Sequence, residues 1–258
     1  MLGSAANLRA ADDAAASSSH RPLFIYLVRP DFPDQTAMMA FLKRRLTADD
    51  FSLPLPGKGA SYASDLPGHR LYPAGNLEGS KRQIERAKEK VPHGWIVFDL
   101  ELPPPNVKVS PELEAAHKNF LKTVEDASVL TRQSGWKFML TPVFPDIKKY
   151  AAQFAPFCDA VVLQVPHSLA DYRGAVKSAV DQIRTANPKC LAFVQIGPRN
   201  RASGLQKINN DFEGLTHSWN AVRDLVDGIL VYFFNEPDPL PGLAKFYDGA
   251  NSGNGAAK

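Results

Sequence analysis

Short apolar segments alternate with helical patterns along most of this chain, and that alternation restricts its fold more than any other feature. Buried strands are predicted at residues 23–28, 69–73, 95–101, 137–143, 159–165, 191–196 and 228–234. Helices are predicted at residues 37–46, 80–91, 110–133, 146–154, 168–186, 204–226 and 240–247. No hairpin turn such as Asn-Gly joins two of these strands directly. Neighbouring strands are therefore expected to pair in parallel, with the helices outside the sheet.

The seven predicted strands are one short of a closed (β/α)8 barrel. An eighth, weak strand within the irregular segment 47–68 would complete the barrel; otherwise the barrel closes with one strand irregular or missing. A doubly wound open sheet is the alternative, but no GxGxxG or P-loop pattern follows any strand, so no cofactor is predicted. The 258 residues, 44% of them hydrophobic, fit a single α/β barrel domain at residues 21–248. Residues 1–20 and 249–258 are expected to be disordered tails.

Composition excludes several classes of partner. The 30 basic and 27 acidic residues are too evenly balanced for a nucleic-acid-binding surface, and no apolar run approaches the roughly 20 residues that cross a bilayer. We therefore expect a soluble protein with no nucleic-acid or membrane partner. The six histidines show no HxH or HExxH spacing, so no metal site is predicted. No signal peptide is visible, but a secreted or periplasmic protein whose signal had been removed would look the same, which leaves the compartment open.

Two carboxylates at the end of the strand 95–101 are the first candidates for chemistry. Side chains alternate across a strand, so Val97, Asp99 and Glu101 share one face and the apolar residues between them share the other. The acidic face is expected at the carboxyl end of the barrel, where the binding sites of such folds lie. The alternative is structural: Asp99 caps a loop or forms an ion pair, and Glu101 is solvated.

Other strands also end in polar residues that are expected at the same end of the barrel. Buried amides need partners, so glutamines near the ends of two adjacent strands indicate either a polar ligand site or satisfied core amides. Glu236 would add a third carboxylate, with a loop residue before proline as the alternative. The predicted ligand-binding and acidic residues are Gln164, Gln195, Tyr232, Asn235, Asn76 and Glu236.

Two short motifs carry a resemblance to known enzymes. Phe98-Asp99-Leu100-Glu101 resembles the Asp-x-Glu signature of several TIM-barrel glycoside hydrolases, such as the chitinase-like and lysozyme-like barrels. Asn235-Glu236-Pro237 resembles the Asn-Glu-Pro acid/base motif of another group of barrel glycosidases. The resemblance implies a carbohydrate substrate, with Glu101 as general acid and Asp99 as its positioning or electrostatic partner. Glu236 would then be the nucleophile or a second acid.

Two other functions remain open from the sequence. A non-catalytic barrel could bind a glycan or a protein with the same polar residues, and Tyr62, Tyr72 or Trp219 would suit sugar stacking if exposed there. A phosphate-handling isomerase or lyase would use Arg199 and Arg201, in the loop after the strand 191–196. Solvated loop charge is the structural alternative for the two arginines.

The two cysteines bear on strand order and compartment. Cys158 and Cys190 each precede a predicted strand, so both are expected at the amino-terminal end of the barrel if those strands are neighbours. Buried free thiols are favoured over a disulfide, since free cysteine is commonly a small core residue. A disulfide would indicate an oxidising compartment.

Overall fold

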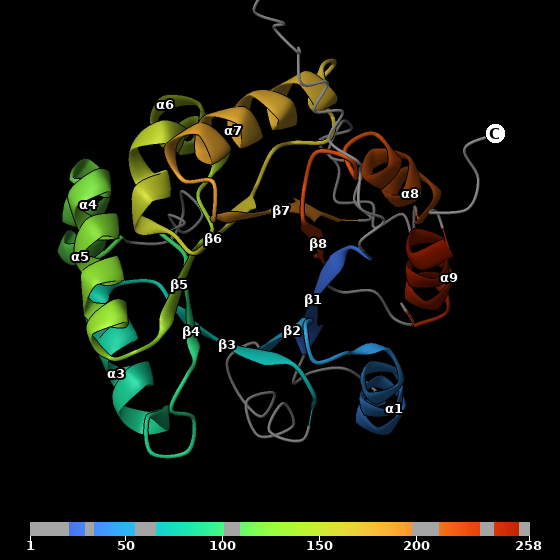
Figure 1. Cartoon of the computed structure of the whole chain (residues 1–258), viewed down its shortest axis with the longest axis horizontal. Coiled ribbons are helices and arrows are strands. Elements are labelled where there is room, and N and C mark those ends of the chain that lie inside the picture. The colour runs from blue at the N-terminus through green and yellow to red at the C-terminus, as the bar shows by residue number, and fades with distance from the viewer. Residues whose placement is uncertain are drawn as a thin grey trace, which may run out of the picture.

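The computed structural model describes residues 21–28, 34–54, 66–100, 109–197, 212–232 and 240–252. In these ranges eight parallel strands close into a barrel in chain order, with β8 paired back to β1 (Figure 1). The strands are β1 Leu23–Val28, β2 Phe51–Pro54, β3 His69–Ala74, β4 Trp95–Phe98, β5 Lys137–Leu140, β6 Ala160–Leu163, β7 Leu191–Ile196 and β8 Gly228–Val231. β2 lies within residues 47–68, where one of the two alternatives had placed an eighth, weak strand. The predicted (β/α)8 barrel is therefore confirmed.

Helices surround the barrel (Figure 1). They are α1 Gln35–Arg45, α3 Leu77–Ala87, α4 Pro111–Lys118, α5 Phe120–Gln133, α6 Phe144–Phe154, α7 Tyr172–Ala186, α8 Phe212–Asn220 and α9 Leu240–Ser252, with a short 3-10 helix at Ala155–Phe157. Within the described ranges, no helix is both long and apolar enough to span a membrane.

Side-chain caps explain where several helices begin. The side chains of Asp34 and Ser110 accept hydrogen bonds from first-turn N–H groups of α1 and α4. Asn76, not Ser80, caps α3, so this helix begins at residue 77 and not at residue 80. The predicted helix 110–133 is two helices, because the backbone at Asn119 leaves the helical conformation (φ −113°, ψ 39°).

The strand register shows which side chains face the barrel axis. The rings of Phe24 and Tyr26 in β1 lie 5.0 and 4.8 Å from that of Tyr247 in α9, so these two residues face the helices. Ile25 must then face inward, and its partner Phe51 in β2 faces the same way. Paired residues on neighbouring strands point to the same side of the sheet, so the strand pairing identifies the inward residues of all eight strands. Other inward positions are Leu27, Leu53, Leu71, Val97, Met139, Val162, Phe193 and Leu230.

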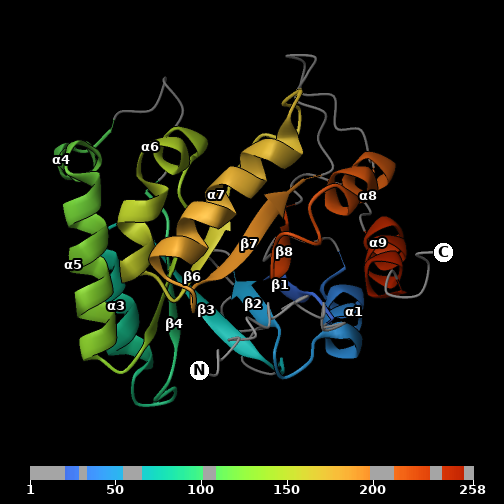
Figure 2. The ribbon, with the colours of Figure 1, turned by 45° about the horizontal axis from the view of Figure 1, so that its top comes forward.

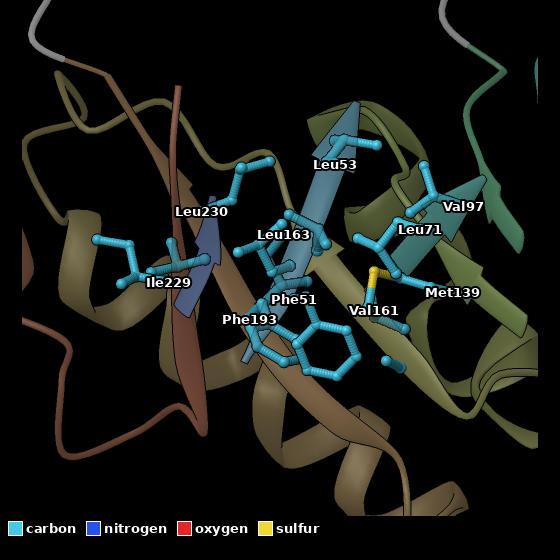
Figure 3. Packing of buried hydrophobic residues seen from close by; sticks show 14 of the residues in the cluster. Phe51, Leu53, Leu71, Val97, Met139, Val161, Leu163, Phe193, Ile229 and Leu230 are labelled. Carbon is cyan, nitrogen blue, oxygen red and sulfur yellow. The ribbon is translucent and has the colours of Figure 1, made fainter. Parts of the chain in front are cut away.

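Aromatic rings fill the amino-terminal end of the barrel interior. The ring of Phe51 lies 5.2 Å from that of Trp95 and 5.5 Å from that of Phe193, both nearly perpendicular to it. Figure 3 shows Phe51 and Phe193 side by side at the centre of the packed residues. The ammonium group of Lys137 lies 5.0 Å from the Trp95 ring centroid, a cation–π distance. This end of the barrel is a packed core, so side chains that bind a ligand inside the barrel are expected at the opposite end.

Because Gly228 has no side chain, the ring of Phe193 can pack against its backbone. A Cβ atom at residue 228 would lie 2.2 Å from the backbone oxygen of Leu23 and 2.7 Å from the Phe193 ring. We therefore expect Gly228→Ala to lower the free energy of unfolding by about 1–3 kcal/mol, the usual cost of overpacking. Gly249→Ala in α9 is the matched control: a Cβ there meets nothing within 4 Å, and better helix propensity should stabilise the chain by up to about 1 kcal/mol. Urea unfolding of both variants measures the difference, and equal effects would contradict the packing argument.

Three aspartates share one arrangement at the amino-terminal ends of the strands. Asp50, Asp159 and Asp227 immediately precede β2, β6 and β8. Each carboxylate accepts a hydrogen bond from the second N–H group of the preceding strand, at 3.0, 2.8 and 2.7 Å. Each also lies near an arginine, at 2.7, 3.6 and 3.3 Å. The Asp50 side chain is fully buried, whereas the other two are 32% exposed. These carboxylates tie adjacent strands together, and Asp50 does so without access to water.

Both cysteines are buried free thiols. They precede β6 and β7, which are paired neighbours, so the predicted strand order is confirmed. The Cys158 thiol donates to the carbonyl oxygen of Phe154 at 3.4 Å. Burial raises the pKa of Cys158 well above its usual value and that of Cys190 to about 12. Both residues therefore remain protonated core residues at neutral pH.

Candidate functional site

Polar residues occupy inward positions at the carboxyl end of the barrel. Asp99 continues the inward face of β4 beyond Val97, and Gln195 and Tyr232 do the same for β7 and β8. Continuing the register of β5 and β6 adds Thr141 and Gln164. We call Asp99, Thr141, Gln164, Gln195 and Tyr232 the mouth. Thr141 is buried and the other four residues are partly exposed, so this end of the barrel offers polar groups within reach of solvent.

Backbone hydrogen bonds fix the position of Asp99. Its N–H donates to the carbonyl oxygen of Ala74 at 2.9 Å, which extends the pairing of β3 and β4 by one residue. A Cβ at Gly75 would lie 3.3 Å from the Asp99 carbonyl oxygen, so the glycine allows this close approach. The two strands thus hold the Asp99 backbone from one side, and its carboxylate stands at the mouth.

Thr141 connects three strands beside Asp99, although its sequence pattern did not mark it as a site residue. Its N–H and hydroxyl groups both donate to the carbonyl oxygen of Phe98, at 3.0 and 3.2 Å. Its own carbonyl oxygen accepts a hydrogen bond from the Gln164 side chain at 3.3 Å. Gln164 is therefore partly a satisfied structural amide, as one alternative held, while it also remains partly exposed at the mouth. The Thr-Pro pair at the end of a predicted strand was the available signal.

Gln195 and Tyr232 lie on adjacent strands on the other side of the mouth. The Tyr232 N–H donates to the carbonyl oxygen of Ile196 at 2.8 Å and continues the ladder between β7 and β8. A Cβ at Gly197 would lie 2.7 Å from the Tyr232 carbonyl oxygen, so only glycine fits between the two chains there. This close packing places an amide and a phenol on neighbouring inward positions.

Asn76 follows β3 but its side chain has a structural partner. Its Oδ1 atom accepts a hydrogen bond from the Gly79 N–H at 2.6 Å and caps α3. The side chain is exposed, so its amide nitrogen faces solvent near the carboxyl end of β3. Helix capping accounts for the oxygen; a ligand contact would have to use the amide nitrogen.

Several predicted site residues lie outside the described residues. These are Glu101, Asn235 and Glu236 among the predicted site residues, and Tyr62, Arg199 and Arg201 among the alternatives. The ranges 29–33, 55–65, 101–108, 198–211 and 233–239 follow β1, β2, β4, β7 and β8 in the chain. The structure therefore places Asp99, Gln164, Gln195 and Tyr232 at one end of the barrel and leaves the roles of the other residues as predictions.

Two aromatic residues considered for sugar stacking are not exposed at the mouth. Tyr72 is 7% exposed and faces outward, where its ring lies 4.9 Å from that of Trp136. Trp219 of α8 is 1% exposed. The exposure that sugar stacking requires is therefore absent at these two residues. Both faces of β3 are apolar at this point, so alternation along the strand could not show which face was inward.

Asp146 is a further acidic group near this end that the sequence analysis treated only as part of a helix start. It lies in the first turn of α6, which begins directly after the carboxyl end of β5. Burial raises the pKa of Asp146, against the opposing effects of His117 and Lys149. The Nε2 atom of His117 is buried and has no hydrogen-bond partner in the described part of the chain. Desolvated titratable groups of this kind are more frequent near functional sites than elsewhere.

The described residues thus bring a carboxylate, a phenol, a hydroxyl and two amides to inward positions at one end of the barrel. Such groups hydrogen-bond hydroxyl-rich ligands, and a carboxylate can also orient or stabilise a charge. Among the described residues, no group of three or more His, Cys, Asp or Glu side chains is placed to hold a metal ion.

The fold and these residues define a (β/α)8 barrel with polar side chains at the carboxyl end. No protein-family model and no curated protein matches the chain. Similar solved structures include a xylanase-alpha-amylase inhibitor protein in complex with trehalose, at 9% identity and a TM-score of 0.49 over 91% of this chain and 99% of that one. A chitinase domain from Pyrococcus furiosus complexed with chito-oligosaccharides has 10% identity and a TM-score of 0.48 over 92% and 97%. A putative deoxyribose-phosphate aldolase from Toxoplasma gondii has 10% identity and a TM-score of 0.49 over 90% and 94%. These are likenesses of fold.

Proposed function

We propose that the chain is a glycoside hydrolase-like barrel that cleaves a carbohydrate by carboxylate general acid/base catalysis. One observation carries the proposal: Asp99 stands at the carboxyl end of β4, on the inward side, in the same ring as Gln164, Gln195 and Tyr232. A carboxylate within a ring of hydrogen-bonding groups suits a polyhydroxylated substrate.

Each residue has a distinct proposed role. Glu101, two positions after Asp99, is the general acid/base, and Asp99 orients it or tunes its charge. Glu236 is the nucleophile or a second acid, and the separation of the two catalytic carboxyl groups determines whether the anomeric configuration is retained or inverted. The sugar hydroxyl groups are bound by Gln164, Gln195, Tyr232, Asn235 and the exposed amide nitrogen of Asn76.

The second candidate is a barrel that binds glycans without cleaving them. It is favoured by the fact that Asp99 is the sole carboxylate among the inward mouth positions of the described residues. Glycoside hydrolysis ordinarily needs a pair of carboxyl groups, whereas binding needs none. The two candidates therefore differ in whether Glu101 and Glu236 complete the pair.

Hydrolysis and binding assays on the intact chain separate these candidates. We expect new reducing ends from at least one of four soluble substrates: chito-, xylo-, cello- or malto-oligosaccharides. Isothermal titration calorimetry with the same sugars measures binding independently. Saturable binding without cleavage would favour the second candidate, and neither binding nor cleavage of any of the four would contradict both.

A further inference from the structure

A groove lies between α1 and α9 on the outer side of the barrel. The two helices run beside each other and next to β1 in both views of the ribbon (Figures 1 and 2). The groove has a volume of about 560 Å³. Its lining residues, which define the α1–α9 groove, are Arg21, Phe41, Arg44, Arg45, Thr47, Ala244 and Asp248.

The α1–α9 groove is at the opposite end of the barrel from the mouth. Arg21 precedes β1, Thr47 precedes β2, and Arg45 is the last residue of α1. In a (β/α)8 barrel the starts of strands and the ends of helices lie together at the amino-terminal end. The groove is therefore separate from the proposed glycan site, and an inference about it does not depend on that site.

Three arginines line the groove, and carboxylates pair with two of them. Arg45 forms a two-pronged pair with Asp248, at 2.8 and 3.0 Å. Arg21 forms a similar pair with Asp50 behind the groove wall, at 3.0 and 2.7 Å. Arg44 is exposed and has no ion pair with any described residue. Of the three guanidinium groups that line the groove, those of Arg21 and Arg45 are held by carboxylates and that of Arg44 is not.

We propose that the α1–α9 groove binds the phosphate group of a small phosphorylated molecule. Arg44 supplies a guanidinium group that no carboxylate pairs with in the described part of the chain, and the N–H groups of Arg21 and Arg45 that do not face a carboxylate supply further donors. Planar guanidinium groups match the geometry of phosphate oxygens. Phe41 and Ala244 line the apolar part of the groove, where the carbon skeleton of the ligand would lie.

Titration of the intact chain tests this proposal. The probes are inorganic phosphate and phenyl phosphate, with sodium chloride at matched ionic strength as the reference. We expect saturable binding of both, with phenyl phosphate binding more tightly because its ring adds apolar contact. Sodium chloride should produce no saturable signal. Absence of saturable phosphate binding would overturn the proposal.

Matched variants separate a phosphate site from general surface charge. Arg44→Ala should weaken phosphate binding by about tenfold or more, the usual range for a charged hydrogen bond. Lys43→Ala removes the same charge from the adjacent exposed residue of α1, which does not line the groove, and should leave the affinity nearly unchanged. Equal losses in the two variants would show nonspecific attraction and overturn the proposal.

Discussion

Replacing Glu101 by glutamine is expected to lower the rate of glycan hydrolysis by a factor of about 10²–10⁴, the contribution of a general acid/base. Glutamine has nearly the same shape but can neither donate nor accept the proton that the leaving oxygen requires. The measurement is kcat/KM for reducing-end release on the best substrate of the panel. Sugar affinity should change little, since the variant keeps a hydrogen-bonding side chain.

Two further variants make the result specific. Glu114→Gln on the exposed surface of α4 is the matched control and should hydrolyse at the wild-type rate. Asp99→Asn should reduce kcat less than Glu101→Gln does and shift the pH–rate profile, because Asp99 is proposed to act through Glu101. Unchanged hydrolysis by Glu101→Gln would exclude it as the general acid.

Most of the barrel strands could be predicted because they are runs of mainly apolar residues. β1 and β7 have the predicted bounds, since a strand covered on both faces needs apolar residues throughout. β2 was harder to recognise, because Phe51–Pro54 is only four residues long and ends in proline. It was inferred only from the count that a closed barrel requires. The number of strands that a closed barrel needs thus indicated β2, which its own four residues did not.

Helix boundaries were less predictable because several polar residues compete as caps. Ser80 was chosen as the start of α3, but Asn76 holds that position, and the Ser80 hydroxyl instead donates to the Asn76 carbonyl oxygen at 3.3 Å. The break at Asn119 has no proline or glycine to announce it. Both differences depend on side-chain hydrogen bonds that composition alone does not reveal.

The site residues on the strands could be predicted, because alternation along a strand shows which side chains share a face. Starting from Asp99, the same parity selected Gln164, Gln195 and Tyr232, and the strand register places all four on the inward side at one end. Asp146 could not be recognised as a site residue, because its burial depends on how α6 packs against its surroundings and a single sequence does not show that packing. The separation of the proposed catalytic carboxyl groups is likewise a tertiary quantity.

Asp50 illustrates why a structural carboxylate can look unremarkable in the sequence. It lies in the irregular segment 47–68, beside Asp49, and nothing in the pattern distinguishes the two residues. In the structure, Asp49 is exposed, whereas Asp50 is completely buried and accepts hydrogen bonds from the Thr47 N–H and hydroxyl groups, both at 2.9 Å. The Phe24 N–H and the Arg21 guanidinium also donate hydrogen bonds to the Asp50 carboxylate. It therefore joins β1, the turn before β2 and the residue that precedes β1.

Asp50→Ala is accordingly expected to lower the free energy of unfolding by about 3–5 kcal/mol, because it leaves a partly buried guanidinium and a buried N–H without their partner. Asp159→Ala and Asp227→Ala remove the same type of contact from sites that are 32% exposed, where water can replace the lost oxygen atoms. Their cost should be clearly smaller. Urea unfolding of the three variants, with Asp49→Ala as a nearly neutral control, gives the order. If Asp50→Ala cost no more than Asp159→Ala, burial would not be what makes this carboxylate important, and its hydrogen bonds to the turn would contribute little to closing the barrel.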